Sequence, residues 1–238
     1  MKLRIDKMLS NMGLGSRKQI KQDARNGYIK INGKTEKDSS RIIDSDKDLV
    51  NYKGQTVKYV QYIYLMMNKP GGVVSATEDN YDSTVLDLLD DEDKVYNPFP
   101  VGRLDKDTEG LLLLTNDGQL AHNLLSPKKH VDKTYYAEVE EELTEKDVKT
   151  FEEGVILTNE NYKTLPAKLE IIESGYPSTC YVTIKEGKFH QVKRMFNAIK
   201  NEVIYLKRIS MGPIKLDESL SLGEYRHLTA YELSSLLH

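Results

Sequence analysis

Cysteine is scarce in this sequence, which limits how the chain can be cross-linked or hold a metal. Cys180 is the single cysteine among 238 residues, so an intramolecular disulfide and a cysteine-based metal cage are both excluded. Apolar runs such as Leu111–Leu114 fall far short of the roughly 20 residues that a membrane-spanning helix needs. The N-terminus, Met1–Asp6, lacks the apolar core of a secretory signal. These absences predict a cytoplasmic protein with no membrane partner.

Signatures of bound nucleotides and metals are also missing. The sequence has no Gly-x-x-x-x-Gly-Lys-Ser/Thr segment, whose backbone would cradle phosphates, and no His and Cys residues spaced as metal ligands. No long amphipathic stretch calls for a dimer. We therefore expect no cofactor of any kind and a monomeric chain.

Charge is distributed unevenly along the chain. The net charge is −3, but residues 1–60 hold 14 Lys and Arg against 7 Asp and Glu, which is a net charge of +7. Of the totals of 34 and 37, the other 178 residues then hold 20 and 30, a net charge of −10. A basic head on an acidic body is typical of a protein that uses one segment to bind nucleic acid.

Two short helices are predicted in the basic head. The first carries an apolar stripe at helical spacing: Ile5, Met8, Leu9 and Met12. The second begins after Ser16, which forms a Ser-x-x-Gln capping box with Gln19, and ends at Asn26-Gly27. Tyr28–Ile31 then alternates as a strand, and Asn32-Gly33 predicts a hairpin turn.

The second helix carries a cluster of cations. At about 100° per residue, four of them fall within one sector of about 100°: Arg17, Lys18, Lys21 and Arg25. A solvated helix face is the ordinary explanation for such residues. Because no acid shares this sector, we interpret the four as RNA-binding residues.

The head resembles the S4 RNA-binding domain over about the first 50 residues. The matching segments are Arg4-Ile5-Asp6-Lys7-Met8-Leu9, Gly13, Ser16-Arg17 and Gly27-Tyr28-Ile29-Lys30-Ile31-Asn32-Gly33. This resemblance implies RNA binding through the helix pair.

The rest of the chain is predicted to be a second domain of α+β class. A linker is expected near Asn51–Gln61, where Gly54 and polar residues interrupt the pattern, and we place the domains at residues 1–58 and 59–238. Strands and helices then alternate irregularly, which favours α+β over a doubly wound sheet. The acidic run Asp87–Asp93 is interpreted as a surface loop.

Residues 102–118 are dense in polar side chains around the apolar run Leu111–Leu114, and three interpretations compete. Four residues match positions 1, 3, 5 and 6 of a calcium-binding EF-hand loop: Asp105, Asp107, Glu109 and Gly110. Asn116 would then replace the required Glu, which disfavours calcium. A purely structural turn before a buried strand is the second interpretation. The third is a catalytic carboxylate, Asp105.

A catalytic carboxylate needs a cation and an aromatic ring nearby, and later segments offer both. Tyr135 lies on the apolar face of a predicted strand. In a helix predicted over 188–201, Lys193 lies at the flank of the apolar face, whereas Arg194 points away from it. We therefore expect Lys193 in a semi-buried ion pair and Arg194 toward solvent or a phosphate.

Several segments, in this order along the chain, are similar to motifs of ribosomal RNA pseudouridine synthases. They are Asn68-Lys69-Pro70, Gly102-Arg103-Leu104-Asp105 with Thr108-Glu109-Gly110-Leu111, Lys133-Thr134-Tyr135, residues 186–196 and residues 223–229. The segments most similar to the small-subunit branch of that family are Lys133-Thr134-Tyr135, Leu165-Pro166-Ala167 and His190–Arg194. The resemblance implies a catalytic domain built on a mixed, largely antiparallel sheet with flanking helices.

The resemblance also implies roles for individual residues. Asp105 would start the reaction, by attacking the sugar or the base or by promoting proton abstraction from the sugar. Lys193 would keep Asp105 ionised and oriented, and Tyr135 would pack on the base and could take its C5 proton. The uridine would be flipped out of its helix. Arg103 would fill the vacated space or bind a phosphate, unless it forms a surface salt bridge.

The remaining RNA-contacting residues implied by the motifs are Lys69, His190 and Arg194. His190 either lines the site or has a structural role. The partner is then ribosomal RNA, as small-subunit RNA or a partly assembled subunit. Two alternatives stay open: a large-subunit pseudouridine synthase of the same family, and a non-catalytic S4-type ribosome-assembly factor.

Overall fold

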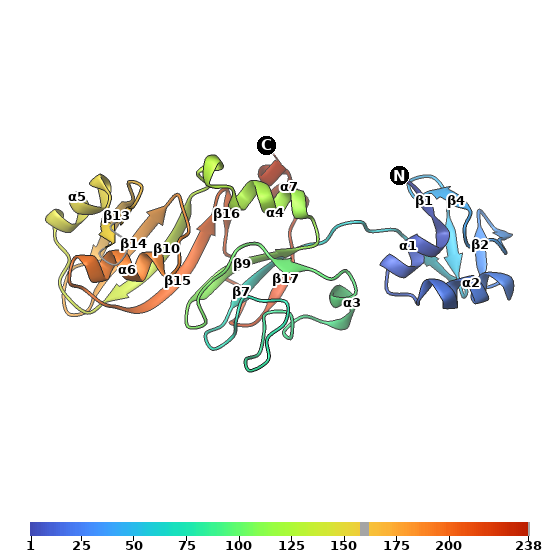
Figure 1. The fold of residues 1–238 in the computed structure, drawn as a ribbon, viewed down its shortest axis with the longest axis horizontal. Helices are drawn as coiled ribbons and strands as arrows, with labels where there is room; N and C mark the ends of the chain where they lie inside the picture. Colours follow the sequence, from blue (N-terminus) through green and yellow to red (C-terminus); the bar gives the residue numbers. More distant parts are fainter. Residues whose placement is uncertain (158–161, 238) are drawn as a thin grey trace. The chain divides into compact units, whose positions relative to one another are not determined.

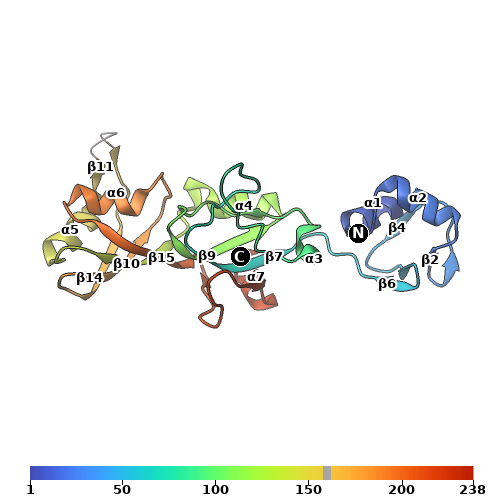
Figure 2. The same ribbon diagram turned by 90° about the horizontal axis from the view of Figure 1, so that it is seen from below.

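The computed structural model of the chain describes residues 1–157 and 162–237. It separates into two compact units: Met1–Ile63 together with Asp90–Asn97, and Tyr64–Leu89 together with the residues from Pro98 onward. Figures 1 and 2 show the elements of each unit. Among the residues described, no helix has the length and apolar character needed to cross a membrane.

The first unit contains the two helices expected from its apolar stripe. They are α1 (Ile5–Asn11) and α2 (Arg17–Arg25), and their inward side chains form a core with Ile29 and Val50. Ser16 caps α2 by accepting a hydrogen bond from the Gln19 backbone at 3.2 Å. The predicted return bond of the capping box is absent, because the Gln19 amide donates to Asp23 instead, at 3.1 Å.

Two small antiparallel sheets complete the first unit. One pairs β1 (Lys2–Arg4) with β4 (Ile42–Asp44), and the other has the order β3 (Lys34–Thr35), β2 (Ile29–Ile31), β5 (Val50–Tyr52), β6 (Gln55–Val57). The predicted hairpin at Asn32-Gly33 is confirmed, with φ of 51° and 81°. The linker predicted at Asn51–Gln61 is wrong over Asn51–Val57, which forms the β5–β6 hairpin.

The turn of that hairpin, Lys53-Gly54, has the same positive φ pair, 50° and 87°. Lysine rarely adopts this conformation, so the sequence does not announce the turn.

A nine-stranded sheet organises the second unit. Its main path is β13 (Lys168–Glu173), β14 (Ser178–Ile184), β10 (Lys133–Val139), β15 (Val203–Met211), β9 (Glu109–Thr115), β7 (Tyr64–Lys69) and β17 (Tyr225–His227). Strand β8 (Phe99–Pro100) pairs with β9, and β16 (Ile214–Lys215) pairs with β15. The described residues also form a separate pair, β11 (Ile156–Leu157) with β12 (Tyr162–Lys163). Among the described strand pairings of the nine-stranded sheet, only β15–β9 is parallel. The predicted α+β class with a mixed, largely antiparallel sheet is confirmed.

Helices flank this sheet (Figures 1 and 2). They are α4 (Gly118–Leu125), the 3-10 turn η1 (Pro127–Lys129), α5 (Glu145–Glu153), α6 (Gln191–Ala198) and α7 (Ala230–Leu237). Phe151 of α5 and Phe196 of α6 are both fully buried and lie 5.1 Å apart between ring centroids.

The first unit includes α3 (Asp91–Lys94), so the acidic run is not all loop. Its acids occupy a first helical turn, where the helix dipole favours negative charge.

Strand β15 lies between β9 and β10 and pairs with both of them. Arg208 pairs with Gly110 of β9 on one side and with Tyr135 of β10 on the other. Gly110 has φ of +97°, and a Cβ there would lie 2.2 Å from the Arg208 carbonyl oxygen. The close parallel contact therefore needs glycine, and it holds the start of β9 against β15, one strand away from β10.

Candidate active site

Asp105 lies in a tight turn immediately before β9. The Thr108 amide donates to the Asp105 carbonyl at 3.1 Å and closes the turn. The Ser75 hydroxyl braces the preceding residue, because it donates to the Leu104 carbonyl at 3.0 Å and accepts from the Leu104 amide at 3.1 Å. The backbone that carries Asp105 is thus held from both sides.

Lys69 holds the same turn from beneath. Its side chain is fully buried, and its Nζ donates to the carbonyls of Pro70, Lys106 and Thr108 at 2.9, 3.2 and 2.9 Å. Burial lowers the pKa of Lys69 to about 8, against the opposing effect of nearby carboxylates. The prediction that Lys69 contacts RNA is therefore wrong: β7 directs it inward, where it supports the Asp105 turn.

The Asp105 carboxylate has two neighbours with basic side chains at the start of α6. Its Oδ1 lies 3.5 Å from His190 Nε2, and its Oδ2 lies 3.8 Å from Lys193 Nζ. Lys193 makes shorter contacts to the second acid of the turn, at 2.6 and 2.7 Å from the Asp107 carboxylate oxygens. Hydrogen bonding from Lys193 lowers the pKa of Asp107 below its usual range.

These distances refine the expected role of Lys193. It is semi-buried beside Asp105, with 21% of its side chain exposed, as the helix geometry suggested. Its nearest partner is nevertheless Asp107, which is 74% exposed and was considered only as a calcium ligand. Lys193 therefore bridges two carboxylates of one turn.

His190 is positioned by the backbone at the beginning of α6. It is the N-cap residue and adopts a left-handed conformation with φ of 49° and ψ of 34°. For this reason α6 begins at Gln191 and not at the predicted Lys188. The His190 ring stacks on Phe189 with centroids 3.8 Å apart, and Phe189 itself is 75% exposed. This places His190 at the rim of the site.

Tyr135 forms a wall of the same cleft. The alternation predicted for its strand is confirmed, and Tyr135 is buried on the inner face of β10 with 7% of its surface exposed. A cleft of about 60 Å³ is lined by residues that include Arg103, Asp105, Tyr135, His190 and Lys193. A larger adjoining cleft of about 430 Å³ shares Arg103 and Tyr135 with it. The structure thus brings together five of the predicted site residues.

The two predicted arginines behave differently. Arg103 is exposed at the rim of both clefts and forms no salt bridge with any described residue, so its surface-salt-bridge interpretation is not supported. Arg194 is partly buried, and its Nη1 donates to the Phe189 carbonyl at 3.3 Å. This bond fastens the loop before α6 and leaves Arg194 half-buried, so its contact with solvent or a phosphate stays a prediction.

Three further residues of the site escaped sequence reasoning. Asp107 is the second partner of Lys193. Thr108 lines the small cleft, and its buried hydroxyl has no hydrogen-bond partner among the described residues. Arg208 is buried along the larger cleft and donates from Nε to the Leu111 carbonyl at 2.8 Å. Thr108 and Asp107 sit within the motif around Asp105, but no local pattern singles out Arg208.

The calcium interpretation is contradicted by the fold. Glu109 opens strand β9, and its carboxylate accepts a hydrogen bond from the Tyr205 hydroxyl at 2.7 Å. Within residues 1–157 and 162–237, no three His, Cys, Asp or Glu side chains gather as metal ligands. The segment is therefore a turn and a strand, not an ion-binding loop.

The cations of α2 form a separate feature in the first unit. All four residues of the predicted cluster are exposed: Arg17, Lys18, Lys21 and Arg25. The nearest acid in sequence, Asp23, is buried on another face and accepts from the Tyr52 hydroxyl. Solvent and RNA phosphates can therefore reach this surface.

Comparison with known proteins agrees with this description. Residues 63–198 match the RNA pseudouridylate synthase family, and residues 3–50 match the S4 domain. The chain is 53% identical to an uncharacterized RNA pseudouridine synthase of Bacillus subtilis (strain 168), over 98% of both chains. It is 41% identical to the ribosomal small subunit pseudouridine synthase A of Yersinia pestis, also over 98% of both.

A solved structure gives the same result. The chain is similar to a crystal structure of a pseudouridylate synthase, with a TM-score of 0.69, 38% identity and coverage of 98% of this chain and 99% of that one. The sequence match, the two family models and the fold therefore agree. The chain belongs to the RNA pseudouridine synthases, which are isomerases, and carries an N-terminal S4 RNA-binding domain.

Proposed function

We propose that this protein converts a specific uridine of 16S ribosomal RNA to pseudouridine, with Asp105 as the catalytic carboxylate. The observation that supports the assignment is the cleft in which the Asp105 carboxylate, His190, Lys193 and Tyr135 meet. The small-subunit substrate is supported by relatives named ribosomal small subunit pseudouridine synthase A, at 38–41% identity over 98% of this chain.

The reaction needs no redox change and no energy source. The N1–C1′ bond breaks, the base turns, and a C5–C1′ bond forms while the C5 proton is lost and N1 gains one. A carboxylate, a cation and a ring are sufficient for this sequence: Asp105 starts it, Lys193 orients Asp105, and Tyr135 packs on the base. We accordingly assign no cofactor to the protein.

The position of the carboxylate supports base flipping. Asp105 lies in a cleft with 25% of its side chain exposed, so a uridine stacked within an RNA helix cannot reach it. The nucleotide must leave its helix and enter the cleft. Arg103, exposed at the rim, then contacts a phosphate or fills the vacated position, and His190 contacts the entering nucleotide.

The proposal extends to the organisation of the whole chain. Residues 1–58 act as the RNA-binding domain and residues 59–238 as the catalytic domain. The four cations of α2 contact RNA phosphates and strengthen binding without selecting a sequence. The protein acts as a cytoplasmic monomer on small-subunit RNA, either free or in a partly assembled subunit.

The catalytic assignment can be tested by the release of tritium from 5-³H-uridine in a small-subunit RNA transcript. We expect Asp105→Asn to reduce the rate at saturating enzyme by roughly 10³-fold or more, as loss of a reacting group does. Asp107→Asn is the matched control, because both carboxylates contact Lys193. Asp107→Asn should retain most of the wild-type rate. A large loss with Asp107→Asn and a small one with Asp105→Asn would show that Asp107 is the reacting carboxylate.

A further inference from the structure

The sheet of the first unit has one face that its core leaves open. Ile29, Ile31, Val50 and Tyr52 point into the core, so the residues between them point outward. Across the strands, Lys30 pairs with Thr35 on one side and with Asn51 on the other. The outer face therefore presents a polar row with no apolar cover.

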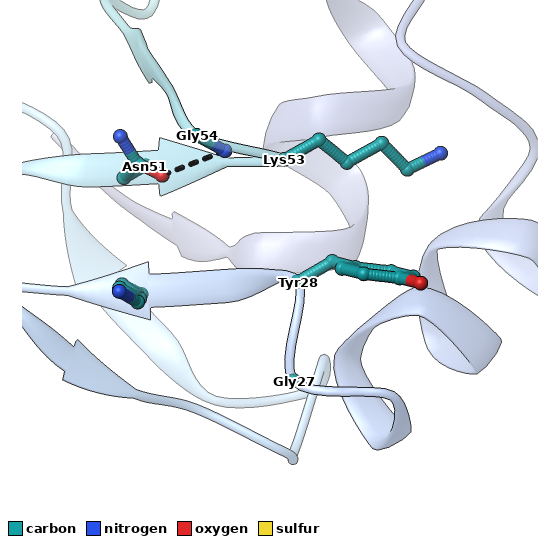
Figure 3. Close-up of a pocket in the computed structure, with 6 residues that line it drawn as sticks. Gly27, Tyr28, Asn51, Lys53 and Gly54 are labelled. Carbon is teal, nitrogen blue, oxygen red and sulfur yellow. Dashed lines mark hydrogen bonds between the residues drawn. The ribbon is translucent and has the colours of Figure 1, made fainter.

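A cavity of about 550 Å³ opens at the end of this face. Its lining is Gly27, Tyr28, Lys30, Asn51, Lys53 and Gly54. Figure 3 shows Tyr28 and Lys53 extending side by side from the ends of neighbouring strands, and the Lys53 amide donates to the Tyr28 carbonyl at 2.8 Å. A cavity of this volume can hold a nucleotide.

Tyr28 is the unusual residue of this cavity. Tyr28 is 50% exposed, although the next residue, Ile29, is fully buried as the first residue of β2. The ring makes no aromatic contact, and the hydroxyl makes no hydrogen bond, with any other described residue. An exposed aromatic ring at the end of a sheet offers a surface on which a protein can stack an unpaired base.

Asn51 and the two lysines supply matching polar groups. The Asn51 Oδ1 accepts from the Gly54 amide at 3.1 Å, which turns the Nδ2 donors away from the turn (Figure 3). Lys53 is anchored by the buried Asp23 carboxylate at 3.0 Å, so its position is fixed and its charge partly balanced. Lys30 is exposed and has no acidic partner among the described residues, which leaves its charge available for a phosphate.

We propose that this cavity binds one unpaired nucleotide of the RNA substrate, with the base stacked on Tyr28, a carbonyl oxygen of the base on Asn51 Nδ2, and a phosphate on Lys30. The inference rests on the proposed function only in taking RNA as the ligand. It adds to the α2 cations a contact that distinguishes single strands from duplex, because bases within a duplex are already stacked.

The experiment compares full-length variants in binding a fluorescent 12-nucleotide single-stranded RNA and a blunt duplex of the same length, by anisotropy. Tyr28→Ala should weaken single-strand binding by about 5- to 160-fold, the range for loss of one base–aromatic stack. Tyr28→Phe should stay near wild type, and so should Tyr231→Ala, which removes an 82% exposed tyrosine of α7. Lys30→Gln should lower the slope of log K against log salt by about 0.7.

Unchanged single-strand binding by Tyr28→Ala, or an equal loss on the duplex, would overturn the proposal. So would wild-type protein that does not bind the single strand. The tritium-release assay separates this outcome from the proposed function. Tyr28→Ala should need a higher enzyme concentration than the wild type to reach half of its maximal rate of tritium release. An inactive wild type whose single-strand binding still depends on Tyr28 would refute only the catalytic proposal.

Discussion

Replacing Lys69 by methionine tests how the turn that carries Asp105 is supported. The substitution keeps the buried stem but removes the Nζ that donates to the carbonyls of Pro70, Lys106 and Thr108. At pH 7 we expect Lys69→Met to lower the free energy of unfolding by roughly 2 kcal/mol, because buried carbonyl oxygens lose their donor.

The pH dependence of this difference gives the sharper result. Burial lowers the pKa of folded Lys69 to about 8, whereas an unfolded lysine titrates near 10.5. Below pH 8 the Lys69 side chain is protonated in both the folded and the unfolded protein. The cost of burying its charge then lowers the free energy of unfolding. Between pH 8 and 10.5 the unfolded state binds more protons, so the stability of the wild type rises with pH relative to the variant. From pH 7 to 9.5 the gain is about 2 kcal/mol.

Urea unfolding of both proteins at pH 7 and 9.5 measures this gain, since other titrations are common to both. The matched control is Lys106→Met, which removes a 52% exposed lysine of the same turn. Because Lys69 is intact in Lys106→Met, that variant should keep the gain in stability that the wild type owes to Lys69. The difference in free energy of unfolding between the wild type and Lys69→Met should widen at pH 9.5. A difference that stays constant or narrows would refute the buried, charged state assigned to Lys69.

Three other predictions concern the framework of the second unit. Gly110→Ala should lower the free energy of unfolding in urea by more than about 2 kcal/mol, because its Cβ would meet Arg208; a near-neutral change would contradict the close strand contact. Cys180 should not react with Ellman's reagent at pH 8 unless denatured, since burial raises its pKa to about 12; rapid native labelling would contradict this. Glu232→Gln should destabilise the protein at pH 7 and less at pH 3. Hydrogen bonding from Arg226 lowers the pKa of Glu232 to about 2, so its contribution is complete above about 4.5 and is lost as pH falls toward 2; urea unfolding at both values decides.

Much of the fold could be predicted because its signals are local. The apolar stripe of α1, the cap at Ser16 and the turn at Asn32-Gly33 each depend on residues a few positions apart. The alternation in β10 likewise predicts which face of the strand is buried, and it placed Tyr135 correctly on the inner face.

The errors concern features that depend on distant residues or on unfavourable local geometry. Lys69 is charged, so the sequence suggests exposure. Its burial is explained by the carbonyls of Lys106 and Thr108, which only folding brings to it. The Lys53-Gly54 turn contains a lysine at positive φ, so the sequence pattern there indicates a linker although the chain forms a hairpin. The preference of Lys193 for Asp107 over Asp105 depends on how α6 packs against the turn, which helix periodicity alone does not determine.

The most direct test of the account is carbodiimide-based mapping of pseudouridine in small- and large-subunit ribosomal RNA, free and partly assembled, treated with wild type or Asp105→Asn. The account predicts one new site in small-subunit RNA with the wild type and none with Asp105→Asn. A site in large-subunit RNA would contradict the proposed substrate, and a site that persists with Asp105→Asn would contradict the catalytic assignment. No site on any RNA that the protein still binds would favour a non-catalytic assembly factor.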